Sequence, residues 1–389
     1  MPPSKRSRYS TTRQKACQSC SNAKAKCDRK ETCSRCASRG LTCSYPGSES
    51  RDTSILLDAS EEVLDVQLDL QTPSSVGQAP QAPQTLPQTH AQTPDFTGLE
   101  LVCPINSDDI KNRWLNSYVP LAGQTVKDYS PSVMNFVYRM LKSYASMVVR
   151  DHGVPPFIHS SQVTLTPLST CFTLARICEN PLPGSENVAT EILQREMTRL
   201  YEQHEEYDVN LLGLFQAYLI YTMVLFFHPN PAMPFLRQAM INLQEIACST
   251  SQQGLVCLAE QQGIRPRWEA WVVAEAKRRT LFTMYFLDNV LSAQDGLPTY
   301  IGYELHGLYA PSSKALWQAD ARREWERRYN SHLVEWVDGT FQLDELWPIP
   351  ANMTQEDIDQ RRKRVDRWLE GVDEYGTMLY AASSCTHGG

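Results

Sequence analysis

Apolar residues recur every three or four positions through most of the chain after residue 98, which is the spacing of one helix face. The clearest case follows Ser130-Pro131, where a serine suited to capping precedes a proline suited to the first helical position. The positions sharing that face are Val133, Val137, Met140, Leu141, Tyr144 and Val148. Further helices are expected roughly over residues 162–179, 187–205, 209–228, 234–248, 269–292, 314–333 and 354–380. Because alternating strand patterns are scarce, the pattern predicts a large all-α domain over residues 99–389.

The most apolar stretch of the chain runs from Leu211 to Phe227. It is 17 residues long and contains Gln216 and Thr222, whereas a membrane-spanning helix needs about 20 apolar residues. We therefore expect a buried central helix, and we expect no membrane partner.

Two segments within residues 47–98 lack the pattern of a folded domain. Ile55–Leu70 combines leucines at heptad spacing with five acids and no base. This combination is compatible with a short dimerisation helix, an activation segment or an acidic linker. Gln71–Pro94 holds five prolines, six glutamines and no charged residue, so it cannot bury enough apolar surface to fold. We expect a disordered linker over residues 47–98, acidic first and then rich in Pro and Gln. Whether the protein is a monomer or a homodimer is left open by this pattern.

Charge divides the chain unequally. The whole chain carries a net charge of −7, but residues 1–45 hold 11 bases and two acids, for a net charge of +9. The remaining residues therefore carry −16. A small cation attached to an acidic body is typical of a protein whose short N-terminal part meets nucleic acid. Residues 1–14 are expected to be a basic disordered tail, serving as a nuclear import signal, an arm along phosphates or a solvated end.

Six cysteines fall within 27 residues and form two copies of C-x2-C-x6-C, namely Cys17, Cys20, Cys27, Cys33, Cys36 and Cys43. The basic N-terminus lacks the apolar core of a secretion signal, which disfavours disulfides, and iron–sulfur clusters usually need other spacings. Thiolate pairs two residues apart are typical of zinc sites. Two separate four-coordinate zinc ions would need eight ligands, and no histidine can supply the missing two because the first is His90. The economical solution is two zinc ions that share two bridging thiolates. The repeat symmetry nominates Cys17 and Cys33 as the bridging ligands.

The two halves of this repeat differ in charge. Lys24 and Lys26 lie between Cys20 and Cys27, whereas the matching gap in the second half holds the single base Arg39. A short helix beginning near Cys20 would present Lys24 at its far end, where a lysine can donate to guanine in the major groove. With six thiolates and two zinc ions counted, residues 1–45 keep a charge of about +7, which suits a phosphate backbone.

From Ala16 to Tyr45 the sequence resembles the fungal zinc binuclear cluster transcription factors. The resemblance rests on the cysteine spacing, on Lys24 and Lys26, on Cys27-Asp28 and on the aromatic residue after the last cysteine. Two departures are Ser21 and Ala23, where the family usually carries bases, and a loop over residues 28–32 that lacks the usual proline.

The resemblance implies two short helices around two zinc ions over residues 15–46. In the family pattern Cys17 and Cys33 bridge, Cys20 and Cys27 complete one site, and Cys36 and Cys43 complete the other. It also implies that Lys24 reads bases of a CGG triplet and that Lys26 contacts phosphate. Lys15, Arg29 and Lys30 are further candidates for DNA contacts.

Trp268–Asp288 and Leu308–Trp317 are similar to the helical regulatory region of the same factors. Physically, the two tryptophans Trp268 and Trp271 are expected to face a core. Glu275 is placed to pair with Arg278 or Arg279, one helical turn further on.

We interpret the chain as a sequence-specific DNA-binding regulator of RNA polymerase II genes that acts in the nucleus. Its expected partners are double-stranded DNA with CGG-type sites and the transcription machinery. The resemblance suggests a fungal metabolic pathway, such as one for a secondary metabolite. No catalytic motif gives a reason to propose an enzyme. The alternatives are a zinc-stabilised protein-interaction module with non-specific nucleic-acid binding and, more weakly, a helical enzyme or ligand sensor with a DNA-binding appendage.

Overall fold

The structure is a computed structural model, and it divides into two compact units, residues 1–87 and 88–389. The residues that it describes are 16–23, 25–28, 30, 32–39, 43, 94–116, 118–119, 125–179, 184–205, 210–229 and 231–387. The expected basic tail, residues 1–14, and the segment Ile55–Leu70 lie outside the described residues. So do most of the expected linker and its Pro- and Gln-rich part up to residue 93.

Two short helices form the described part of the first unit. They are α1 (Gln18–Asn22) and α2 (Ser34–Ser38), and each begins directly after a cysteine in extended conformation, Cys17 and Cys33 respectively. The prediction of a small domain with two short helices around the cysteines is confirmed.

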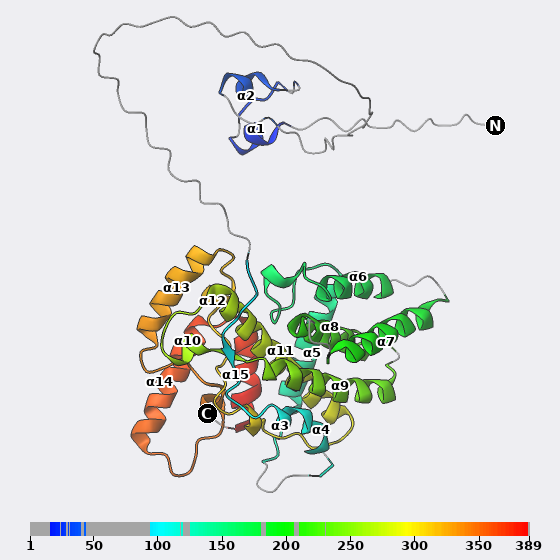
Figure 1. Ribbon diagram of the computed structural model, residues 1–389, viewed down its shortest axis with the longest axis vertical. Helices are drawn as coiled ribbons and strands as arrows, with labels where there is room; N and C mark the ends of the chain where they lie inside the picture. The colour runs from blue at the N-terminus through cyan, green and yellow to red at the C-terminus, as the bar shows by residue number, and fades with distance from the viewer. Residues whose placement is uncertain are drawn as a thin grey trace, which may run out of the picture. The chain divides into compact units, whose positions relative to one another are not determined.

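The second unit is helical, which confirms the all-α prediction (Figure 1). Its helices are α3 (Asp108–Lys111), α4 (Arg113–Asn116), α5 (Pro131–Val149), α6 (Leu168–Glu179), α7 (Glu186–Gln203), α8 (Leu211–Phe226), α9 (Met233–Gln252), α10 (Leu258–Gln261), α11 (Trp268–Gln294), α12 (Lys314–Trp317), α13 (Arg322–Glu335), α14 (Gln355–Gly371) and α15 (Glu374–His387). Short 3-10 turns span Ser160–Gln162, Tyr303–Leu305 and Leu343–Leu346. A minimal antiparallel ladder joins β1 (Leu101–Val102) to β2 (Val256–Cys257), with Leu101 opposite Cys257.

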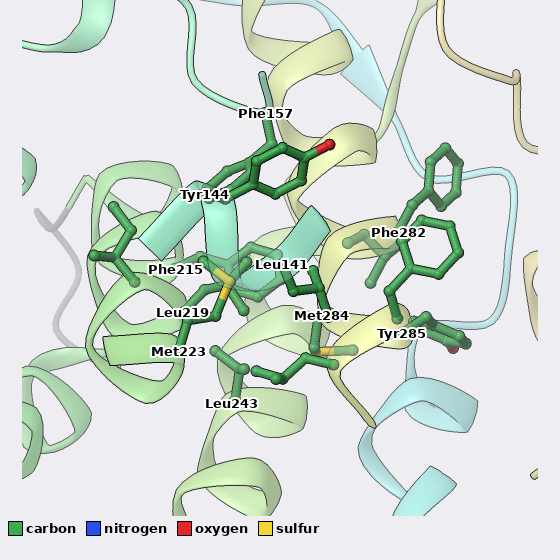
Figure 2. Close-up of a cluster of buried hydrophobic side chains, with 14 of the residues drawn as sticks. Leu141, Tyr144, Phe157, Phe215, Leu219, Met223, Leu243, Phe282, Met284 and Tyr285 are labelled. Carbon is green, nitrogen blue, oxygen red and sulfur yellow. The ribbon is translucent and has the colours of Figure 1, made fainter. Parts of the chain in front are cut away.

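The helix α8 lies in the middle of this body. Fifteen of its 16 residues are buried, so it has no solvent face, as the apolar stretch predicts. Figure 2 shows Phe215, Leu219 and Met223 of this helix gathered with Leu141 of α5 and Met284 of α11. None of the described helices combines the length and the apolar character needed to cross a membrane.

The helix α11 is buried along almost its whole length, although it carries several charges. Trp271 is fully buried, and its ring lies 5.4 Å from that of Trp325 and 6.5 Å from that of Trp317. Trp268 is also buried. The prediction that these two tryptophans of α11 face a core is therefore confirmed.

Two expected helices are broken in two. The prediction of one continuous helix over residues 314–333 is wrong, because α12 ends at Trp317 and α13 starts at Arg322. In one continuous helix residues 317 and 325 would lie about 12 Å apart along the axis, so both could not pack on Trp271. The helix expected over 354–380 breaks after Gly371, and Asp373 Oδ1 then accepts a hydrogen bond from the Gly376 N–H at 3.0 Å, which starts α15.

Two other helix boundaries also differ from the expected ones. The helix expected from residue 162 begins only at Leu168, because Pro167 lacks an N–H and disfavours helical geometry at the residue before it. The helix expected to stop at residue 248 continues to Gln252. There the Thr250 hydroxyl is satisfied by the carbonyl of Ile246 at 2.8 Å, one turn back.

Candidate metal centre and DNA-contacting residues

The sequence repeat places four sulfur atoms together. Cys17 and Cys33 precede α1 and α2, and the C-x2-C spacing puts Cys20 and Cys36 in the first turn of each helix. Cys17 Sγ lies 3.7 Å from Cys33 Sγ and 3.7 Å from Cys36 Sγ, and Cys20 Sγ lies 3.6 Å from Cys33 Sγ. All four side chains are fully buried.

These separations fit zinc rather than disulfides. A disulfide brings two sulfurs to about 2.05 Å, whereas a tetrahedral zinc ion with Zn–S bonds of about 2.3 Å holds its sulfurs about 3.8 Å apart. The donor atoms of Cys17, Cys20, Cys33 and Cys36 all lie within 4.8 Å of one another. The sulfur-only donor set and its spacing are therefore those of a thiolate zinc site.

The other two cysteines of the repeat lie beside Cys33. The donor atoms of Cys27, Asp28 and Cys33 lie within 4.8 Å of one another. The Cys33 backbone N–H donates to Cys43 Sγ at 3.2 Å. The structure thus brings all six sequence-predicted cysteines into one small region, with Cys27 and Cys43 half-buried at its edge.

Hydrogen bonds and burial shift the pKa values of these thiols in opposite directions. Donation from the Cys36 backbone N–H lowers the pKa of Cys33, while burial raises the pKa of Cys17 and of Cys36. Zinc ligands are thiolates, so binding the metal releases the protons of the thiols that burial keeps neutral.

Two functional residues were missed as such by the sequence analysis. Asp28 accepts a hydrogen bond from the Ser34 N–H at 3.1 Å and so closes the loop at the start of α2. Its signal was the Cys27-Asp28 pair, which we noted only as part of the family pattern. Arg35 Nη1 donates to Cys20 Sγ at 3.9 Å. Nothing in the spacing identified it.

Only two of the five predicted DNA-contacting residues can be placed. Lys26 is exposed just after α1. Lys30 is also exposed, and its Nζ lies 3.8 Å from the Asp28 carboxylate. Lys15, Lys24 and Arg29 lie outside the described residues.

Residues 15–52 match the fungal Zn(2)-Cys(6) binuclear cluster domain, a match that covers all six cysteines. No curated protein and no solved structure matches the chain. A domain of this kind binds two zinc ions. Residues 15–52 are therefore a domain of the fungal Zn(2)-Cys(6) binuclear cluster type, and a domain of this type indicates a DNA-binding transcription factor.

Proposed function

We propose that this protein is a sequence-specific regulator of RNA polymerase II genes that acts in the nucleus and recognises CGG-type sites. The observation that carries the proposal is the zinc-type sulfur cluster within a segment of net charge +9, on a chain whose remainder carries −16. The basic segment would supply attraction to phosphates, and the acidic body would limit non-specific spreading along DNA.

Within the cluster, we propose that Cys17 and Cys33 bridge the two zinc ions. The geometry supports this assignment because each of these sulfurs lies within 3.7 Å of a sulfur from the other half of the repeat. Cys20 and Cys27 would complete one site, and Cys36 and Cys43 the other. Fixed in this way, α1 would hold its following lysines in a defined direction.

The proposed division of labour separates base readout from phosphate binding. Lys24 would donate to guanine in the CGG triplet, while Lys26, with Lys15, Arg29 and Lys30, would contact phosphates. The acidic helical body would meet proteins of the transcription machinery, and a homodimer would read paired triplets. The controlled genes would belong to a metabolic or secondary-metabolite pathway.

The test is fluorescence anisotropy of the full chain on a CGG duplex and on a scrambled duplex, with and without a zinc chelator. Lys24→Ala is expected to weaken binding to the CGG duplex by about 1–3 kcal/mol and to remove the preference for it. Lys26→Ala is expected to weaken binding to both duplexes equally and to make that binding less dependent on salt concentration. Lys142→Ala, at an exposed position of α5, serves as the charge-matched control.

Equal affinity of the wild-type chain for both duplexes would contradict sequence reading. A steep dependence on salt in that case would favour the alternative, a zinc-stabilised interaction module with non-specific nucleic-acid binding. Unchanged binding by Lys24→Ala would reject the role assigned to that lysine.

A further inference from the structure

A cavity of about 540 Å³ lies in the helical body. Residues 94–102, here called the strap, contribute Phe96, Leu99 and Leu101 to its wall. The rest of the wall includes the apolar residues Leu211 and Leu212 of α8 and Val273 of α11, and polar residues such as Asn210 and Gln253 lie among them. Volume and lining of this kind are typical of small-molecule sites.

Two residues that line this cavity each carry a buried amide oxygen without a partner among the described residues. Gln216 is completely buried, and its Nε2 donates to the Phe157 carbonyl at 3.0 Å, which fixes the orientation of the amide. Its Oε1 then has no donor among the described residues, and neither has Oε1 of Gln162, which is 5% exposed. A buried carbonyl oxygen without a hydrogen bond is costly, so both oxygens call for donors that the described chain does not supply.

A buried cation completes the lining. Lys277 is 3% exposed, and its Nζ donates to the Gly254 carbonyl at 3.1 Å. No carboxylate among the described residues forms an ion pair with it. Burial lowers its pKa to about 8, so most molecules carry the charge at pH 7. The ammonium group has three N–H donors, and an anion would compensate the charge.

A second cavity shows that volume alone does not select the site. It measures about 680 Å³ and is lined by Ser312, His332 and Trp336, among others. None of the partnerless buried atoms found in the described residues belongs to its lining. The smaller cavity is therefore distinguished by its chemistry.

We propose that the 540 Å³ cavity binds a small, mostly apolar organic acid that also carries a hydroxyl or N–H donor. The acid group would meet Lys277, the donor would meet Gln162 or Gln216, and the apolar part would pack under the strap. This site does not depend on the proposed DNA binding, because every residue that lines it belongs to the second unit.

The strap would act as the cover of the site. It is held to α11 by Arg267, whose side chain donates to the carbonyls of Asp95 at 2.7 Å and Thr97 at 3.3 Å. It is held again by the pairing of β1 with β2. A bound ligand would add contacts to Phe96 and Leu99, so it should slow proteolysis of the strap.

The first test is isothermal titration calorimetry of the full chain with a hydroxynaphthoic acid as the probe. Naphthol lacks the acid and methoxynaphthoic acid lacks the donor, and each is expected to bind about tenfold more weakly. Lys277→Met should weaken binding of the hydroxy acid about tenfold while changing that of naphthol by less than about twofold. Gln162→Met should weaken binding of the hydroxy acid and leave binding of the methoxy acid unchanged. Lys142→Met, on the exposed face of α5, is the control and should match wild type.

Failure of all three compounds to bind, or equal binding of the hydroxy acid by wild type and Lys277→Met, would overturn the proposal. A second measurement does not depend on the choice of probe. Without ligand, Lys277→Met is expected to raise the melting temperature, because it removes an uncompensated buried charge. A lower melting temperature would mean that Lys277 is a structural partner of Gly254. A crystal structure grown with the probe that shows only ordered water on Gln162, Gln216 and Lys277 would also overturn the site.

Discussion

Oε1 of Glu275 accepts a hydrogen bond from Nε of Arg279 at 2.7 Å, and neither side chain is exposed to solvent. Oε2 accepts a second hydrogen bond from Arg278 at 2.6 Å, and the Ser312 N–H donates to Oε1 at 2.9 Å. Arg279 also contacts Asp373 at 2.6 Å, directly before α15. One carboxylate and its arginine therefore join α11 to two segments that follow it in the chain.

Glu275→Gln is expected to lower the free energy of unfolding by about 3–5 kcal/mol, because it leaves two buried arginines without their shared charge. Urea unfolding of the full chain measures this loss. The matched control is Glu191→Gln, which breaks an exposed pair with Arg195 at 3.5 Å and should cost less than about 0.5 kcal/mol. Similar losses in both variants would show that the buried network contributes no more than a surface pair.

The stability of the helical body should fall in mild acid through His159. Burial lowers the pKa of this histidine to about 4, with Asp320 opposing the shift and Arg279 adding to it. The unfolded chain takes up the proton near pH 6.5. The stabilisation is therefore complete above that pH and is lost as the pH falls towards 4, by roughly 2–3 kcal/mol.

Unfolding free energies of wild type and His159→Gln, measured from pH 7 down to 4.5, check this expectation. The unfolding free energy of the variant should decline less steeply with falling pH, because glutamine takes up no proton on unfolding. The contributions of all other groups are common to both proteins. Parallel curves would contradict the role of His159.

Removal of zinc should affect one unit and spare the other. The cysteines form a core of their own, separate from the two apolar cores of the helical body. A chelator is expected to abolish α1, α2 and DNA binding while leaving the melting transition of the body unchanged. Differential scanning calorimetry with and without chelator measures this, and a clear drop in the melting temperature of the body would show that the units depend on each other.

Loss of a bridging thiolate should reduce the metal content of the whole cluster. Cys33→Ser is expected to bring the zinc content below two ions per chain, because this sulfur is proposed to serve both metals. The control is Cys178→Ser, a half-buried thiol outside the cluster. Colorimetric zinc determination on both variants is decisive, and two ions retained by Cys33→Ser would rule out its role as a ligand.

Gly254 allows the strap to approach the body closely. Its φ is +97°, and an added Cβ would lie 2.4 Å from Leu101 Cβ. Gly254→Ala should therefore displace β1, destabilise the body by about 1–3 kcal/mol and speed proteolysis of residues 94–102. Gly263→Ala is the control, since its φ is +68° but no atom lies within 4 Å of the added Cβ. Equal effects would assign the loss to backbone strain alone.

Features set by nearby residues could be predicted from the sequence. The helix α5 begins at Pro131, and the Ser130 hydroxyl accepts a hydrogen bond from the Val133 N–H at 3.4 Å, as the capping pattern indicates. The expected pairing of Glu275 one turn on is confirmed with both arginines. In each case the partners lie within four residues, so local geometry decides the outcome.

Features set by distant partners could not be predicted. The break before α13 depends on the fit of Trp317 and Trp325 against Trp271. Lys277 resembles a surface lysine in sequence, but its acceptor at Gly254 lies 23 residues away and the strap lines the cavity around it. No periodicity within α11 identifies such a site, because the residues that create it come from five separate segments.

Both ends of the described body converge on α11. Leu101 of β1 packs against the apolar cluster that contains Trp271, and the Tyr375 hydroxyl of α15 donates to the Arg279 carbonyl at 2.7 Å. Shortening the helical body from either end would therefore uncover α11. A recombinant fragment meant to isolate the body should start no later than Pro94 and retain α15, or it will expose that helix and aggregate.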